Sequence, residues 1–207
     1  MEIQIRNFEN TDYSQCEELV NEAWRFDKIF ESKTLVDTAL RMYTKGALCS
    51  SNIKLIAVDQ NKVVGFLFGL NLLAKSKPQG RIKFVFETLI ALNFRRMDKK
   101  GRNSFLNAVR EHNSNRLKAD PKHTSEICLF VVSQGYRGKN IGTKLWDAFR
   151  DTCVASKVNK VRVETNKLGA SSFYERLGFK HAVDFYSPLH EMGTPGGQAC
   201  MYEYDLI

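Results

Sequence analysis

The segment YRGKNIGTKLW, residues 136–146, combines glycines and cations directly before a stretch with helical periodicity. Gly138 and Gly142 let the backbone turn and approach a ligand closely, and Arg137 and Lys139 add positive charge. The first turn of a helix has unpaired N–H groups and carries the positive end of the helix dipole. The segment therefore predicts a binding site for an anion such as a phosphate group.

Two common phosphate motifs do not match this segment. A nucleoside triphosphate loop needs G-x-x-x-x-G-K-S/T, whereas the chain continues Thr-Lys after Gly142, in the wrong order. The dinucleotide pattern G-x-G-x-x-G is missing from the same window. Both kinds of nucleotide site are disfavoured.

The elements around the loop predict an α/β protein with a mixed sheet. Alternation and apolar runs predict strands at 2–8, 53–59, 63–73, 125–132, 160–165, 180–186 and 199–206, and helical spacing predicts helices at 13–24, 34–45, 141–156 and 170–177. The second and third strands flank a three-residue turn, which indicates an antiparallel hairpin.

Residues 74–122 interrupt this rhythm and look like an insertion. They hold 13 Lys/Arg and 4 Asp/Glu, a net of +9, so they carry the whole excess charge of a chain whose net charge is +8. Two or more helices are predicted here, with a turn around Gly101 and a stop at Pro121. Such a block could meet nucleic acid, an anionic substrate or an acidic partner, or it could simply be a solvated helical face.

Length and composition limit the number of domains, the cellular location and the kinds of metal or disulfide site that can be expected. With 207 residues and 43% hydrophobic content, a single domain over 1–207 is expected. No apolar run is long enough for a membrane span, and the start MEIQIRN lacks signal-peptide features, so a cytoplasmic protein without membrane contact is expected. Five cysteines without a CxxC pair and four histidines without ligand spacing predict neither a disulfide framework nor a metal site.

Two motifs resemble those of the GNAT superfamily of acyl-CoA-dependent N-acetyltransferases. The stretch VVSQGYRGKNIGTKL is similar to its pyrophosphate loop, with Asn140 at the usual middle glycine, and asparagine is the residue that best replaces glycine in a left-handed backbone. The stretch ETNKLGASSFYERLGF, residues 164–179, resembles the family's strand-to-helix segment. Its matching residues are Asn166, Ala170, Tyr174, Glu175, Gly178 and Phe179.

The resemblance implies a mostly antiparallel central sheet flanked by helices, with residues 74–122 as a helical insertion between the third and fourth strands. Acetyl-CoA would be the cosubstrate, with its pantetheine arm along a strand edge and backbone N–H groups of a bulge near Val132 facing the oxyanion. The implied cofactor-binding residues are Phe130, Val131, Val132, Arg137, Gly138, Lys139, Asn140, Ile141, Gly142, Thr143, Asn166 and Tyr174.

The resemblance also suggests the catalytic groups. Tyr174 would protonate the leaving thiolate, and Glu126 would remove the amine's proton, with Glu164 and Glu87 as weaker candidates. Strand alternation places Glu126 on the face of Cys128 and Phe130, in a cleft that would raise its pKa. The alternative roles are a core aromatic for Tyr174 and a solvated strand-end carboxylate for Glu126.

The acceptor pocket would lie between residues 24–32 and 188–198. Trp24, Phe26 and Phe30 could line it, and Asp27 or Glu31 could attract a cationic amine. The function implied is acetyl transfer to a primary amine, on a small molecule or a peptide, by direct attack in a ternary complex. The alternatives are a non-catalytic acyl-CoA sensor, or binding of nucleic acid or an anionic partner through the insertion, of which nucleic acid is disfavoured. The insertion could also cap the cleft or mediate a homodimer.

Overall fold

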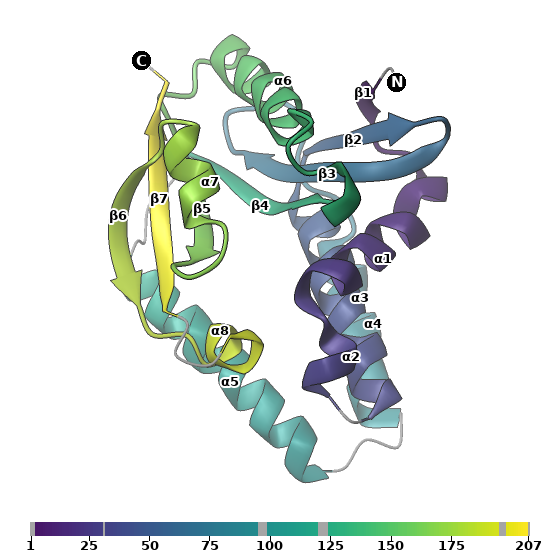
Figure 1. The fold of residues 1–207 in the computed structure, drawn as a ribbon. Helices are drawn as coiled ribbons and strands as arrows, with labels where there is room; N and C mark the ends of the chain where they lie inside the picture. Colours follow the sequence, from purple (N-terminus) through teal and green to yellow (C-terminus); the bar gives the residue numbers. More distant parts are fainter. Residues whose placement is uncertain (1–2, 31, 95–98, 120–123, 195–197, 207) are drawn as a thin grey trace.

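A seven-stranded sheet organises the part of the chain that the computed structural model describes, residues 3–30, 32–94, 99–119, 124–194 and 198–206 (Figure 1). The strand order is β1-β2-β3-β4-β5-β7-β6, and every neighbouring pair is antiparallel except β4 and β5. The strands are β1 (Gln4–Asn7), β2 (Ile53–Asp59), β3 (Lys62–Asn71), β4 (Ser125–Val132), β5 (Lys160–Asn166), β6 (Lys180–Phe185) and β7 (Ala199–Asp205). The predicted mixed, mostly antiparallel sheet is confirmed.

Helices cover both faces of this sheet. They are α1 (Tyr13–Trp24), α2 (Phe26–Ile29), α3 (Lys33–Ser50), α4 (Arg81–Phe94), α5 (Lys99–Ala119), α6 (Ile141–Ala155), α7 (Ser171–Arg176) and α8 (Pro188–Gly193), with short 3-10 turns at Asn10–Asp12 and Gln134–Tyr136. Among these described helices none is long and apolar enough to cross a membrane. The sequence pattern missed α2 and α8, which are too short to show a helical period.

Two apolar cores lie on opposite faces of the sheet. Leu145, Trp146 and Phe149 of α6 pack with Ile127 and Val163 on one face. On the other face, α1 and α3 cover a second core. Its strand residues include Phe66, Phe68, Leu129 and Val131. The cofactor loop and the acceptor pocket are expected on these two faces respectively.

The parallel strands β4 and β5 pair over a short distance and then diverge. Glu126 pairs with Arg162 and Ile127 with Val163, and within these two fully described strands no further pair follows. The edge of β4 that faces β5 is therefore free of strand partners from Cys128 to Val132. This fork is the feature that positions the site.

A bulge in β4 overturns the alternation predicted for this strand. Phe68 of β3 pairs with Leu129 and Gly69 with Ile127, so Cys128 is the extra residue. Ile127 and Phe130 consequently pack with the core under α6, whereas Leu129 belongs to the opposite core. The bulge lies at Cys128 and not near Val132, because the register from Leu129 to Val132 is regular.

The basic segment forms two helices between β3 and β4, and their position agrees with the prediction. It remains a prediction that these two helices are an addition to the family's fold. The turn expected at Gly101 is wrong, since α5 already begins at Lys99 and continues through this glycine. Pro121, the predicted stop, lies outside the described residues.

Candidate active site

The loop before α6 has the backbone that an anion site requires. Gly138 has φ +77°, and Asn140 has φ +59° in the left-handed region, which confirms the tolerance expected of asparagine at this position. Asn140 is the N-cap of α6, but its side chain makes no capping hydrogen bond. The N–H groups of Ile141, Gly142 and Thr143 therefore have no side-chain cap at the positive end of a 15-residue helix.

Side chains from distant elements hold this loop in place. The carboxylate of Glu22, on α1, accepts a hydrogen bond of 2.6 Å from the backbone N–H of Gln134 and also bonds the Ser133 hydroxyl. The Tyr136 hydroxyl donates to Asp59 at 2.9 Å. The loop is thereby tied to α1 and to the end of β2 before any ligand binds.

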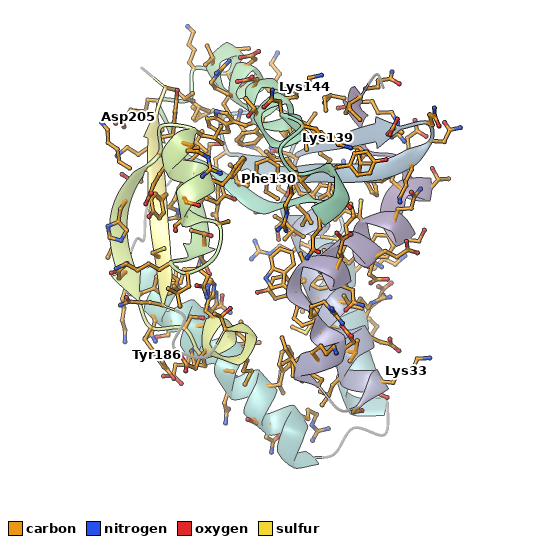
Figure 2. The ribbon with its side chains drawn as sticks, in the orientation of Figure 1. Lys33, Phe130, Lys139, Lys144, Tyr186 and Asp205 are labelled. Atoms are coloured by element: carbon orange, nitrogen blue, oxygen red, sulfur yellow. The ribbon has the colours of Figure 1, made fainter. Side chains whose placement is uncertain are left out.

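The cations of the loop face solvent. Arg137 and Lys139 are exposed, and the Lys139 ammonium lies 4.5 Å from the centre of the Tyr136 ring. Figure 2 labels Lys139 in the loop just before α6 and Phe130 on β4. Ile141, by contrast, is buried in the core, so only its backbone can reach a ligand.

Close packing explains the glycine at position 142. A Cβ atom there would lie 2.9 Å from the ring of Phe173, which itself meets Phe130 edge to face at 5.4 Å. Any larger residue has to displace this aromatic pair. Gly142 therefore permits α6 and α7 to meet above the fork of β4 and β5.

The remaining cofactor candidates lie around the fork. Phe130 and Val132 are half-buried beside the core under α6, whereas Val131 points into the opposite core and can offer only its backbone. At the end of β5 the side-chain oxygen of Asn166 accepts a hydrogen bond from the N–H of Leu168. Asn166 thus shapes the turn that leads to α7.

Tyr174 is buried on α7, packed edge to face against Phe173 and Phe179. Burial raises its pKa above the ordinary value, so the hydroxyl keeps its proton at neutral pH. This property suits a proton donor, and it equally suits a core aromatic.

Glu126 does not lie free in an apolar cleft. Because of the bulge it shares the face of Leu129, opposite to Phe130, and it is ion-paired with Arg116 of α5 and with Arg162 of β5. The predicted orientation toward Phe130 is therefore wrong. Glu87, the other weaker candidate for the base, joins α4 to α3 through ion pairs with Arg41 and Lys45. It does not belong to the ion-paired group of Glu126, Arg116 and Arg162.

A second carboxylate, Glu164, gathers three cationic or titratable groups at the fork. It accepts a hydrogen bond of 2.7 Å from Arg116 and shares one of 2.9 Å with His190, and Nε2 of His112 lies 3.7 Å from its Oε1. Burial acts to raise the pKa of Glu164, but the hydrogen bond from His190 and the charges of His112, His190 and Arg116 outweigh burial and lower it.

His112 completes this cluster. Its Nδ1 lies 2.8 Å from the hydroxyl of Ser187, and its ring stacks on His190 with centroids 6.1 Å apart. Burial is the largest cause of the lowered pKa of His112; Glu164 opposes it, and the charges of His190 and Arg116 add to it. His112 is consequently neutral at pH 7.

None of the sequence motifs indicated a role for His112, His190 or Arg116. One signal was present, because Phe105, Val109, His112 and Arg116 follow each other at helical spacing. Two polar residues at the end of an apolar stripe indicate a buried polar site. Only the fold, however, could bring that stripe to Glu164.

A cavity of about 200 Å³ lies beside this cluster, between α1–α3 and the pair α5 and α8. The lining includes Trp24, Phe26, Phe30, Phe105, Val109 and His112. Asp27 is outside it, since Asp27 pairs with Arg25 on the surface, and Glu31 lies outside the described residues. Helix α5 thus closes a cavity to which the segments 24–32 and 188–198 both contribute; that this cavity is the acceptor pocket stays a prediction.

Comparison with known proteins agrees with this geometry. Residues 92–187 match the family model described as acetyltransferase (GNAT) domain, which confirms the resemblance that the two motifs carry. No curated protein sequence matches the chain significantly.

Solved structures match over nearly the whole chain. An aminoglycoside 6'-N-acetyltransferase complexed with coenzyme A has 13% identity and a TM-score of 0.57, and the match covers 99% of this chain and 97% of that one. The ribosomal-protein-S18-alanine N-acetyltransferase from Escherichia coli has 13% identity and a TM-score of 0.58, with 99% and 94% covered. The PaiA N-acetyltransferase from Thermoplasma acidophilum, in complex with coenzyme A, has 16% identity and a TM-score of 0.57, with 99% of each chain covered. At these identities the likeness shows a shared fold.

Proposed function

We propose that this protein is an N-acetyltransferase that moves an acetyl group from acetyl-CoA to a primary amine by direct attack in a ternary complex. The observation that carries the proposal is the start of α6 beside the fork of β4 and β5. Gly138 and Asn140 with positive φ expose the first-turn N–H groups, and Arg137 and Lys139 add charge. The match to an acetyltransferase domain supports the same conclusion.

The residues present fit acetyl-CoA. The N–H groups of residues 141–143 and the cations at 137 and 139 suit the pyrophosphate, and the open edge of β4 from Cys128 to Val132 offers main-chain groups to the pantetheine amides. When bound, acetyl-CoA supplies the thioester that is attacked. The backbone N–H groups at the Cys128 bulge are candidates for stabilising the oxyanion.

Tyr174 is proposed as the acid that protonates the leaving thiolate. Its raised pKa keeps the hydroxyl protonated, so the donor form is present when the thiolate leaves. Glu126 is better suited to hold the fork together, because Arg116 and Arg162 both pair with it. We therefore assign Glu126 to positioning and not to proton abstraction.

Calorimetric titration of the purified protein with acetyl-CoA tests the proposal, with CoA lacking the 3'-phosphate and ATP as controls. Saturable binding of acetyl-CoA and little response to ATP is expected, followed by thiol release when primary amines are added. No binding of acetyl-CoA would refute the proposal. Binding without turnover on any amine would favour the alternative of an acyl-CoA sensor.

A further inference from the structure

The cluster around Glu164 lies where an acceptor amine must arrive. Glu164 directly follows Val163, the last residue of β5 that pairs with β4. Val163 packs into the core under α6, so its neighbour Glu164 points to the other face, toward α5 and α8. If acetyl-CoA lies on the α6 side of the fork, this carboxylate faces the opening on the acceptor side.

The cavity continues from this cluster and has an apolar character. Trp24 and Phe26 pack against Tyr43 with ring centroids 5.5 and 5.3 Å apart, and Phe30 meets Phe105 edge to face. Burial first, and then the charge of Glu164, raise the pKa of Tyr43, a partly buried residue of the cavity lining. The cavity therefore has mostly aromatic and aliphatic walls and one polar end, at His112 and Asn113.

The size and the walls restrict the occupant. Sites for drug-sized ligands have volumes of roughly 300–1,000 Å³, and this cavity measures about 200 Å³. If the ligand carried a second ammonium or several hydroxyls, these groups would lose their hydration against the aromatic side chains and gain no hydrogen-bond partners from them. A small molecule with one amine and an aromatic body matches both ends of the cavity.

We propose that the acceptor is a small primary amine of the arylalkyl class, whose ring occupies the cavity beneath α5, and that His112 accepts the proton of that amine. This inference rests on the proposed function. Helix α5 supplies the wall residues Phe105 and Val109 together with His112. The basic segment thereby completes the acceptor site.

The proposed reaction converts the acceptor ammonium and the thioester into an amide, a thiol and one proton released to solvent. The ammonium of the acceptor enters beside Glu164 and gives one proton to Nε2 of His112, in the tautomer whose Nδ1–H donates to the Ser187 oxygen. The neutral nitrogen forms a bond to the thioester carbonyl carbon as the carbon–sulfur bond breaks, and the thiolate takes a proton from Tyr174. The second proton leaves the nitrogen for solvent, and Tyr174 and His112 return to their starting states by exchange with solvent.

Charged or titratable groups from three elements face His112. Glu164 comes from β5, His190 from α8, and Arg116 from its own helix, while Ser187 bonds its Nδ1. The combined effect lowers the pKa of His112. The neutral base form is therefore present at pH 7, and kcat should decline only below pH 6.5, as His112 becomes protonated.

The first experiment compares acceptors at saturating acetyl-CoA. We expect 2-phenylethylamine and tryptamine to be acetylated with kcat/KM at least about tenfold above that for spermidine, for an aminoglycoside and for a peptide N-terminus, because each of these must place polar groups against apolar walls. Turnover with spermidine, the aminoglycoside or the peptide but not with the arylalkylamines would overturn the acceptor class and leave the proposed function intact. No binding of acetyl-CoA would instead refute the proposed function.

The second experiment narrows the cavity. Val109→Trp should raise KM for 2-phenylethylamine about tenfold or more without changing the affinity for acetyl-CoA. Val85→Trp is the matched control, because Val85 is an exposed valine on the neighbouring helix α4. An unchanged KM in a folded Val109→Trp protein would overturn the assignment of the cavity.

The third experiment tests His112. His112→Gln keeps a polar group for Ser187 and should lower kcat about 100-fold, with acetyl-CoA affinity unchanged, and abolish the decline of kcat below pH 6.5. His181→Gln is the control, since His181 pairs with Asp184 on exposed β6. If His112→Gln retains full kcat, or if its decline in acid matches that of the unmodified protein, His112 is not the base.

Discussion

The two sides of the fork are built in different ways. The proposed cofactor side is a continuous backbone segment, residues 133–143, in which N–H groups, two residues with positive φ and the start of α6 would provide the binding groups. The proposed acceptor side is assembled from side chains of α1–α3, α5, β5 and α8, which are distant in sequence. A site made of backbone leaves its signature in one short stretch of sequence, whereas a site made of side chains leaves almost none.

The two sides should also respond differently to substitution. On the cofactor side the demands are steric, because Phe173 leaves no space at Gly142, and a change there should affect ligand binding first. On the acceptor side the demands are electrostatic, because Glu126 and Glu164 are both largely buried and share Arg116. A change there should affect folding stability as well as turnover.

The largest effect is expected from Gly142→Glu. Its side chain would both displace Phe173 and put a negative charge where the pyrophosphate is expected, so affinity for acetyl-CoA should fall at least about 100-fold. Calorimetric titration measures this, with Gly142→Gln to separate volume from charge. Gly135→Ala is the control, since a Cβ there meets nothing within 4 Å. Unchanged affinity of Gly142→Glu would contradict the assignment of the loop.

Tyr174→Phe should come next. Loss of the hydroxyl removes the proposed acid, and general acid catalysis typically contributes at least about 100-fold, so kcat should fall by that factor while acetyl-CoA affinity is kept. Steady-state kinetics with a calorimetric Kd separates the two quantities. Tyr202→Phe, which loses a hydroxyl bonded to Glu175, is the control. Equal losses of kcat and affinity, or no loss, would return Tyr174 to a role in core packing.

The difference between the two sides of the fork also explains which features could be predicted from the sequence. The strands, the helices α1, α3, α6 and α7 and the conformation of Asn140 follow from local periodicity and residue type, and the structure confirms them. The bulge at Cys128 could not be foreseen, because it depends on how β3 pairs with β4, and it reverses the face on which Glu126 lies. The turn placed at Gly101 was wrong because one glycine inside a helix costs only about 1 kcal/mol, which neighbouring residues can outweigh.

The charge cluster around Glu126 and Glu164 gives the third prediction, which concerns folding stability. Arg116→Ala leaves Glu126 and Glu164 short of a cation, and since these side chains are 11% and 17% exposed, the free energy of unfolding should fall by about 2–3 kcal/mol. Chemical denaturation at pH 7 measures this change. Adding Glu164→Gln should recover part of the loss, because it removes one of the uncompensated charges.

Arg150 provides the matched control for Arg116. It also pairs with two carboxylates from a helix, Asp147 and Asp151, but on the solvent-exposed side of α6. Arg150→Ala should therefore cost less than about 1 kcal/mol. Equal costs for Arg116→Ala and Arg150→Ala would mean that the buried cluster does not contribute to holding α5 on the sheet.

The smallest effect is expected on the cofactor side, from Lys139→Ala. Lys139 is exposed and lies over the Tyr136 ring, so its attraction for a phosphate is screened by solvent, and acetyl-CoA affinity should fall only about threefold at low salt. The difference should shrink at high ionic strength, which calorimetric titration in two salt concentrations would detect. Lys33, an exposed lysine at the start of α3 and far from the loop in Figure 2, is the control. If Lys139→Ala lost as much acetyl-CoA affinity as Gly142→Glu, side-chain charge and not the backbone would dominate cofactor binding. The contrast between the two sides of the fork would then not hold.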